Sequence, residues 1–221
     1  MNRDLFKEFD EVSAKQWKQK IQFDLKGADY NETLIWKSPD GVDVKPFYHP
    51  DETPAPIPVK TPSKWDICEK IYVASVEKSN KKAREVLQKG AESLWFIIPS
   101  EEIDPKMLFL DIDLEKVLIY LDFEFLSPAF FSKLKAYLSG KKHLVHLNLD
   151  IIGKLARSGN WFHNLNEDHR LLKEILTDSE GFSTVLSIDA SLYQNAGANI
   201  PQQLAYSLAH ANEYLNYFED S

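Results

Sequence analysis

The sequence predicts an α/β fold: a partial (β/α)8 barrel of the TIM type with parallel strands, preceded by an N-terminal arm of one helix and one hairpin. Apolar runs of strand length alternate with helical patterns, as in repeated β-α units of roughly 25 to 40 residues. Five such runs are present, whereas a closed barrel needs eight strands and typically about 250 residues. The chain has 221 residues. We therefore expect either a piece of a barrel or an open five-stranded unit, and we favour the piece.

The arm is predicted to begin with an amphipathic helix. A capping box at residues 13–16 starts an apolar pattern of helical spacing, which Gly27 ends. A hairpin is expected next, with a turn at residues 39–41 between β-prone runs at 33–36 and 42–47. The helix and the hairpin together form the arm that precedes the barrel.

A domain boundary is predicted at residues 62 and 63. Five prolines between residues 50 and 62 forbid a central strand and favour an extended connector. The predicted domains are therefore an arm at 1–62 and a partial barrel at 63–221.

The second domain is predicted to alternate strands and helices. Strand-like runs begin near Ile67, Ser93, Lys116, His143 and Ser183. Helices are expected over residues 77–90, from Pro128 to Gly140, after a cap at Asn166, and over 201–218, with no comparable helix between 95 and 117. The last helix carries an apolar stripe typical of amphipathic helices, made of Leu204, Leu208, Ala211 and Leu215.

Charge and composition narrow the class of partner. The chain has 26 basic and 34 acidic residues, a net charge of −8, so nucleic acid and anionic membranes are poor partners. No apolar run approaches the roughly 20 residues that span a bilayer, and the start lacks an apolar signal region, so we expect a cytoplasmic protein. Cys68 is the only cysteine, which precludes an intrachain disulfide, and we expect its thiol to be buried.

Just before the last predicted helix, residues 194–198 read Gln-Asn-Ala-Gly-Ala. This segment resembles the Gln-x-Ala-Gly-Ala turn of the methylmalonyl-CoA mutase family, which in catalytic chains follows Gly-Tyr-His. In that register Ala190, Ser191 and Leu192 stand at the glycine, tyrosine and histidine positions. An isobutyl side chain can neither donate a hydrogen bond to a thioester carbonyl nor carry a proton. The resemblance therefore implies a chain without the catalytic histidine.

Two further blocks resemble the small, non-catalytic subunit of the same family. Residues 20–48 contain Lys-Ile-Gln, Asp-Leu-Lys-Gly, Leu-x-Trp and Pro-Phe-Tyr in order. Residues 146–161 match a Leu-Asp-Pro-Ile-Gly, Leu-Ala-x-x-Gly-x-Trp stretch, with Ile151 in place of the proline. Together the blocks identify the chain as similar to the N-terminal portion of a small subunit.

The resemblance implies an isomerase complex that interconverts methylmalonyl-CoA and succinyl-CoA with adenosylcobalamin. The cobalamin-binding Asp-x-His-x-x-Gly signature and the Arg-Gly-Pro-Tyr-Pro stretch that contacts CoA are absent from the 221 residues. It follows from the resemblance that this chain has no catalytic, cofactor-binding or metal-binding residues of its own. The implied partner is the catalytic large subunit in a heterodimer, which holds the cofactor, or a second copy when the chain is isolated.

Two groups of residues are candidates for contact. Ser191, Leu192, Tyr193 and Gln194 are predicted to shape a vestigial pocket, although we favour a simpler role for the turn, in which small residues allow close packing. Trp17, Trp36, Phe47 and Tyr48 are predicted to bind a partner, because a hairpin cannot bury so much aromatic area alone. Tyr30 is expected to be exposed with them.

The remaining polar residues allow two alternative functions: a stand-alone α/β small-molecule enzyme, or an acyl-CoA-binding module. Asp150 and Asp189 follow predicted strands, where barrel enzymes keep active residues. His143 and His146 would point to opposite faces of a strand, which argues against a metal site. Solvated surface charge is expected for Asp111, Asp113, Asp122 and Glu124, and surface or helix-end positions for His163 and His169.

Overall fold

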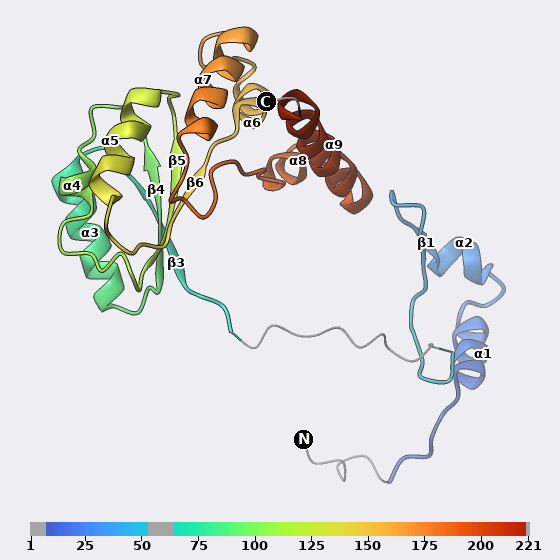
Figure 1. The fold of residues 1–221 in the computed structure, drawn as a ribbon. Helices are drawn as coiled ribbons and strands as arrows, with labels where there is room; N and C mark the ends of the chain where they lie inside the picture. Colours follow the sequence, from blue (N-terminus) through green and yellow to red (C-terminus); the bar gives the residue numbers. More distant parts are fainter. Residues whose placement is uncertain (1–7, 53–63, 220–221) are drawn as a thin grey trace. The chain divides into compact units, whose positions relative to one another are not determined.

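The computed structural model describes residues 8–52 and 64–219. The chain divides into two compact units, Met1–Pro62 and Ser63–Ser221 (Figure 1). Residues 53–62 of the predicted proline-rich connector lie outside the described residues. Among the described helices, none is both long enough and apolar enough to cross a membrane.

The first unit contains the predicted helix and a shorter hairpin than expected. Helix α1 is Ala14–Asp24, and its Ser13 to Gln16 capping box is present as predicted. Strands β1 (Trp36–Lys37) and β2 (Asp43–Val44) pair antiparallel. Residues 33 and 34, predicted as strand, instead end helix α2 (Tyr30–Leu34), because the Asp29 carboxylate accepts hydrogen bonds from two backbone amides and starts a helical turn.

The second unit is built on a parallel sheet of four strands in chain order, β3-β4-β5-β6. These strands are β3 (Cys68–Tyr72), β4 (Ser93–Ile98), β5 (Leu118–Phe123) and β6 (Val145–Asn148). The fifth predicted strand is present only as a single parallel bridge between Leu149 and Leu186. Two flanking hydrogen bonds, from Leu147 N–H to Thr184 O and from Leu149 N–H to Val185 O, keep residues 184–187 beside β6.

Helices connect the strands and follow them. They are α3 (Val76–Gln88), α4 (Pro105–Leu108), α5 (Pro128–Leu138), α6 (Ile151–Ser158), α7 (Leu165–Thr177), α8 (Ser191–Asn195) and α9 (Ile200–Phe218). The predicted cap at Asn166 is wrong, since Asn164 caps α7 by accepting from the amide of Glu167. Between 95 and 117, where no comparable helix was expected, the chain forms only the four-residue α4, which Asp104 caps and whose first turn suits Pro105.

The core lies on one face of the sheet. Ile71, Phe96, Leu121 and Leu147 point to that face from the four strands and are almost fully buried. Figure 1 shows α3, α4 and α5 together on one side of the strands. The prediction that Cys68 is buried is wrong: its thiol is exposed, because Cys68 begins an edge strand and belongs to the opposite register from the buried Ile71.

Helix α9 has the predicted length but an unexpected orientation. Only His210 and Tyr214 are buried among its residues. Leu204, Leu208 and Leu215 are exposed. The leucines of the apolar stripe read from the sequence therefore do not pack on the core of this unit. The side of α9 that carries His210 and Tyr214 does.

Candidate functional site

The sheet face opposite the core carries one side chain from each strand at the same level. Lys70, Trp95, Tyr120 and His146 are register partners across β3 to β6. The Lys70 ammonium lies 4.1 Å from the centroid of the Trp95 ring, and neighbouring ring centroids are 5.9 Å and 5.4 Å apart along the row. His146 Nδ1 then lies 2.9 Å from Thr184 Oγ1. We call these five residues the open-face ladder.

A cleft of about 380 Å³ lies where the open-face ladder meets the carboxyl ends of the strands. This end of a parallel sheet is where ligands of α/β proteins usually bind. Its lining comes from β3 to β6, from α6 and from the segment before α8. The lining residues are Lys70, Trp95, Ile97, Asp122, Phe123, Glu124, Asn148, Leu149, Asp150, Lys154, Arg157, Ser158, Phe162, Ser187 and Asp189.

The charges of the cleft are largely matched within the chain. Asp122 accepts a hydrogen bond from the Asn148 amide at 2.9 Å and lies 3.8 Å from the Lys70 ammonium. Arg157 lies 3.5 Å from Asp189. The arrangement places acids and bases side by side, so neither sign of charge dominates the cleft.

Asp150 is a buried carboxylate at the floor of this cleft. Its Oδ1 accepts hydrogen bonds from the Gly153 amide at 2.7 Å and from the Tyr214 hydroxyl at 2.8 Å. His210 Nε2 lies 2.9 Å from the same oxygen without forming a hydrogen bond to it. His210 Nδ1 lies 3.0 Å from the Tyr193 hydroxyl. We call Asp150, Tyr193, His210 and Tyr214 the Asp150 clasp.

The Asp150 clasp fixes α9 to the carboxyl end of β6. The Tyr214 hydroxyl donates to Asp150 and also accepts the Ile152 amide at 3.0 Å. Burial and the Asp150 charge raise the pKa of Tyr214 well above its usual range, so this hydroxyl keeps its proton. The same two causes raise the pKa of Tyr193. Because a raised pKa keeps a hydroxyl protonated, neither Tyr193 nor Tyr214 is activated as a nucleophile, and the contacts of the clasp serve to hold α9 in place.

Gly153 is required for the clasp. A Cβ atom at this position would lie 1.9 Å from Asp150 Oδ2, far inside contact distance. The carboxylate can therefore cap α6 and fold back over its first turn only when residue 153 has no side chain. Gly153 belongs to the 146–161 block that the sequence singled out.

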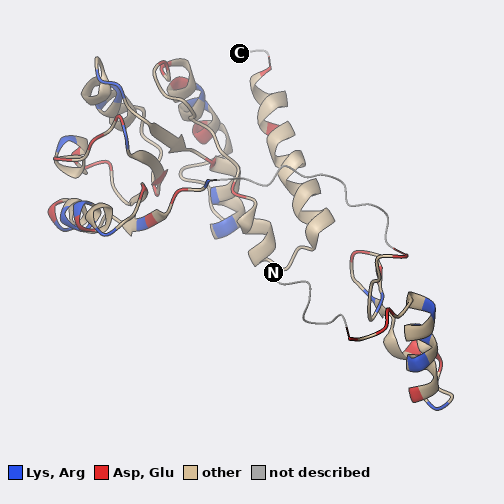
Figure 2. Cartoon of the chain, turned by 90° about the horizontal axis from the view of Figure 1, so that it is seen from below, with Lys and Arg blue, Asp and Glu red and all other residues tan. Residues whose placement is uncertain are grey.

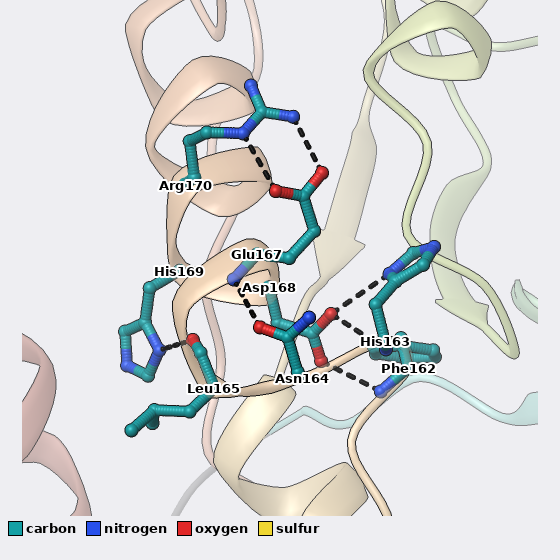
Figure 3. Close-up of polar contacts among 8 residues, drawn as sticks. All are labelled: Phe162, His163, Asn164, Leu165, Glu167, Asp168, His169 and Arg170. Carbon is teal, nitrogen blue, oxygen red and sulfur yellow. Dashed lines mark hydrogen bonds and ion pairs between the residues drawn. The ribbon is translucent and has the colours of Figure 1, made fainter.

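A second buried carboxylate, Asp168, organises the loop before α7 (Figure 3). Its side chain is fully buried and accepts the amides of Phe162 at 2.7 Å and His163 at 3.0 Å. His163 Nδ1 also lies 3.0 Å from it, while half of the His163 side chain is exposed, as predicted. His169, predicted at the surface or at a helix end, lies instead in the second turn of α7. It is buried and donates from Nδ1 to Leu165 O at 2.7 Å, because its ring packs on Tyr217.

The four acids expected as solvated surface charge divide into two pairs. Asp111 pairs with Arg84 and Asp113 with Lys116 away from the cleft. Asp122 and Glu124 both line the cleft, because they end and follow strand β5. Asp150 and Asp189 do meet in one cleft, as their positions after strands suggested. No group of three His, Cys, Asp or Glu residues placed to hold a metal occurs in the described ranges.

The four residues of the predicted vestigial pocket lie on α8. Ser191 and Gln194 are exposed, and Leu192 is half-buried. Tyr193 alone joins a buried network, the Asp150 clasp. The cleft is lined instead by Ser187 and Asp189 from the preceding segment. Sequence reasoning missed His210 and Tyr214, although polar residues four apart on a helix share one face and offered a signal.

The predicted partner-binding aromatics lie in the first unit. Trp36 and Tyr48 are exposed, and Trp17 is about half exposed. Phe47 is half-buried and meets the Trp17 ring edge-on at 6.5 Å. Tyr30, predicted to be exposed with them, is buried, and the Lys18 ammonium lies 4.8 Å from the centroid of its ring.

Comparison with known proteins gives one informative relative. No family model matches the chain. The chain is 28% identical over 240 aligned positions to a protein named methylmalonyl-CoA mutase small subunit, from Porphyromonas gingivalis. The alignment covers 98% of this chain and 39% of that relative, so the chain spans about two fifths of its length. This likeness agrees with the family resemblance read from the three sequence blocks.

Proposed function

We propose that this chain is a non-catalytic small subunit, or the N-terminal part of one, of an adenosylcobalamin-dependent methylmalonyl-CoA mutase. In this role it stabilises the catalytic large subunit. The observation that carries the proposal is that likeness to a small subunit runs through 98% of the chain, across both units. Leu192 at the histidine position supports a role without catalysis.

The strand order supports a barrel-derived fold for this subunit. Strands β3 to β6 are parallel neighbours in chain order, and residues 184–187 follow beside β6. Consecutive strands of a (β/α)8 barrel are arranged in this way. In a doubly wound sheet the strands are also parallel, but the order in which they are added reverses at one point in the sheet. We infer that the second unit is an arc of five barrel positions and that the open-face ladder lies on the surface that would face the barrel axis.

Association is proposed to involve the aromatics of the first unit. Trp36 and Tyr48 expose large rings, which are common anchors at interfaces. Burying each ring contributes on the order of 2 kcal/mol, so losing both should weaken binding about a thousandfold if the effects add. The protein is inferred to be cytoplasmic and to form a heterodimer with the large subunit.

The test is co-expression with the catalytic large subunit of a methylmalonyl-CoA mutase, followed by size-exclusion chromatography with light scattering. We expect one-to-one co-elution and slower thermal inactivation of mutase activity. The double variant Trp36→Ala with Tyr48→Ala should lose co-elution. Phe23→Ala, which removes another exposed ring from the same unit, is the matched control. An unchanged dissociation constant in a folded double variant would contradict the role of these two rings.

The proposed role also predicts that the chain lacks cofactor binding of its own. The isolated chain is expected neither to bind adenosylcobalamin nor to isomerise methylmalonyl-CoA. Absorbance of cobalamin co-eluting with the purified chain at near one-to-one stoichiometry would contradict this. Leu192→His alone should not create activity, because Ser191 and the missing cobalamin signature remain.

A second candidate, an acyl-CoA-binding module, is favoured by one observation. Three basic side chains, Lys70, Lys154 and Arg157, line the cleft at the carboxyl end of the sheet. Calorimetric titration with succinyl-CoA separates the candidates, and Lys154→Ala should abolish any binding there. A stand-alone enzyme using Asp150 or Asp189 is less favoured, because Tyr214 and Gly153 engage the first carboxylate and Arg157 pairs with the second.

A further inference from the structure

The first unit has almost no apolar core. Ala14 and Tyr30 are the only buried residues among its described positions, 8–52. Elements of this size, a short helix and a two-stranded hairpin, are marginal in water when they lack a shared apolar core. Polar contacts between its segments therefore have a large share in fixing the arrangement of this unit.

One such contact joins the end of the described part of this unit to the start of α1. Asp51 Oδ2 accepts a hydrogen bond from the backbone amide of Ala14 at 3.1 Å, across 37 residues of sequence. Ala14 is the first residue of α1, where backbone amides have no acceptor within the helix and the helix dipole favours a negative charge. The hydrogen bond from Ala14 is the main reason that the pKa of Asp51 lies below its ordinary value.

A ring contact accompanies this hydrogen bond. Phe47 meets the ring of Trp17 edge-on, with 6.5 Å between the ring centroids. Trp17 follows Ala14 by three residues, so the two occupy neighbouring positions on one face of α1. The segment 45–52 thus contacts the start of α1 twice, once through a carboxylate and once through an aromatic ring. We call this segment the strap.

Contacts within the strap keep it compact. The Tyr48 hydroxyl accepts the backbone amide of Lys45 at 3.2 Å, and the Lys45 ammonium lies 3.6 Å from the Glu52 carboxylate. The His49 ring is hydrogen-bonded through Nδ1 to Asp51 Oδ1. Asp51 therefore engages α1 with one carboxylate oxygen and the strap with the other, so its side chain connects the two segments.

The strap carries part of the aromatic surface that is proposed to bind a partner. Tyr48 belongs to the strap and is 62% exposed, and Trp17 belongs to α1 and is 49% exposed. Figure 2 shows both signs of charge on this unit, so charge alone marks no binding surface there. The relative placement of the exposed rings is then what a partner can recognise, and it depends on whether the strap lies on α1.

We propose that Asp51 is a positioning residue for partner binding: it fastens the strap to α1 and so presents Trp17 and Tyr48 as one preformed surface. This inference rests on the proposed function, in which the aromatics of the first unit bind the catalytic large subunit. A preformed surface avoids the entropy cost of ordering two segments during association. If the strap is released, only a fraction of the chains is competent to bind, and the apparent affinity falls by that fraction.

A positioning role has a kinetic signature. Asp51 acts in the free chain, before the partner arrives, so its loss lowers the association rate constant. In the complex the partner itself holds the strap in place, and the dissociation rate constant stays nearly the same. A side chain that touches the partner behaves in the opposite way, because the loss of an interface contact mainly raises the dissociation rate constant.

The first test uses the full chain alone and hydrogen exchange read by mass spectrometry. Asp51→Ala should speed exchange in α1 about tenfold, because a hydrogen bond to a charged group is lost, and should leave the second unit unchanged. Asp51→Asn keeps an oxygen that can accept the Ala14 amide and should restore most of the protection. Glu52→Ala removes the neighbouring carboxylate, which contacts Lys45 within the strap, and is the matched control.

A double-mutant cycle tests whether Asp51 acts through the Ala14 amide. Ala14→Pro removes this donor at the first helical position, where proline is well accepted. Exchange in the rest of α1 should quicken as it does in Asp51→Ala. The double variant should exchange no faster than either single variant, since both changes break the same hydrogen bond. Circular dichroism checks that each variant keeps its helix content.

The second test measures binding kinetics to the catalytic large subunit of a methylmalonyl-CoA mutase by surface plasmon resonance. Asp51→Ala should lower the association rate constant about tenfold and change the dissociation rate constant by less than about twofold. Asp51→Asn and Glu52→Ala should bind like the unmutated chain.

Three results would overturn the proposal. They are unchanged exchange in α1 of Asp51→Ala, an unchanged association rate constant in that variant, and faster dissociation shared by Asp51→Ala and Asp51→Asn. The third would mean that the carboxylate touches the partner. An unmutated chain that does not bind the large subunit would contradict the proposed function, and the positioning role would fall with it. Normal binding by the unmutated chain, with unchanged rates in Asp51→Ala, overturns the positioning role alone.

Discussion

Helices α7 and α9 are attached to the same unit by opposite means. Helix α7 turns an apolar row toward the core and buries Leu171, Leu172 and Ile175, with Asp168 closing the loop before it. Helix α9 buries only His210 and Tyr214 and leaves its leucines outside. Hydrophobic burial makes α7 part of the cooperative core, whereas α9 is held mainly by the Asp150 clasp while Leu204, Leu208 and Leu215 stay exposed.

The largest expected difference comes from the same substitution on the two helices. Leu172→Ala removes a fully buried side chain on α7 and should lower the free energy of unfolding by about 3 kcal/mol, which lowers Tm by roughly 6 to 12 °C. Leu208→Ala on α9 should change it by less than about 0.5 kcal/mol, since that side chain is exposed. Urea unfolding at low protein concentration measures both. Equal losses would mean that α9 packs on the core through its leucines.

Gly153→Ala should be the next largest change. The added methyl group would stand 1.9 Å from Asp150 Oδ2, so either the carboxylate or the first turn of α6 must move. Such overpacking costs about 2 kcal/mol. Thermal unfolding measures the loss, with Lys154→Ala on the same helix as the control. A variant as stable as the unmutated chain would show that Asp150 can leave the clasp without cost.

Tyr214→Phe should act mainly on α9. It removes the donor to Asp150 and leaves the Ile152 amide without its acceptor, a loss of about 1 to 2 kcal/mol. Hydrogen exchange should quicken along α9 and stay unchanged in α7. Equally faster exchange in both helices would show that the clasp unfolds together with the core, and that α7 and α9 are not attached by different means.

The smallest effect is an alkaline one. The folded-state pKa of Tyr214 is raised by burial and by Asp150, so the unfolded chain loses this proton first. Stability from this group is complete below pH about 10, the ordinary tyrosine pKa, and is lost as pH rises above it. Stability measured from pH about 9 to pH about 11, across the ordinary tyrosine pKa, should fall less in Tyr214→Phe than in the unmutated chain. Parallel curves would contradict this assignment.

Local sequence signals predicted much of the fold. Apolar runs located all four strands, and the Ser13 to Gln16 capping box and Pro128 marked helix starts correctly. These features depend on neighbours a few residues apart. The prediction failed where packing partners decide the outcome: Cys68 is exposed at a sheet edge, and residues 184–187 make only a bridge.

The site was harder to predict than the fold. Asp150 was identified by its place after a strand, but its partners Tyr214 and His210 come from a helix some 60 residues later. Their spacing of four residues indicates a shared helix face and does not say which residue that face contacts. The apolar stripe of α9 was recognised, yet its periodicity is equally consistent with facing the core or facing another chain. The roles predicted for Ser191 to Gln194 and for Trp17, Trp36, Phe47 and Tyr48 stay predictions.

The span of the Asp150 clasp has a consequence for the order of folding. Neighbouring strands pair across connections of about 25 residues, whereas the Tyr214 hydroxyl reaches Asp150 across a sequence separation of 64. Closing a longer loop costs more chain entropy. The contacts that offset this cost can form only after β6 and the start of α6 are folded. On the ribosome the strands emerge first and can assemble while α9 is still being made. Docking of α9 should therefore be a late step, and Tyr214→Phe should speed unfolding far more than it slows folding.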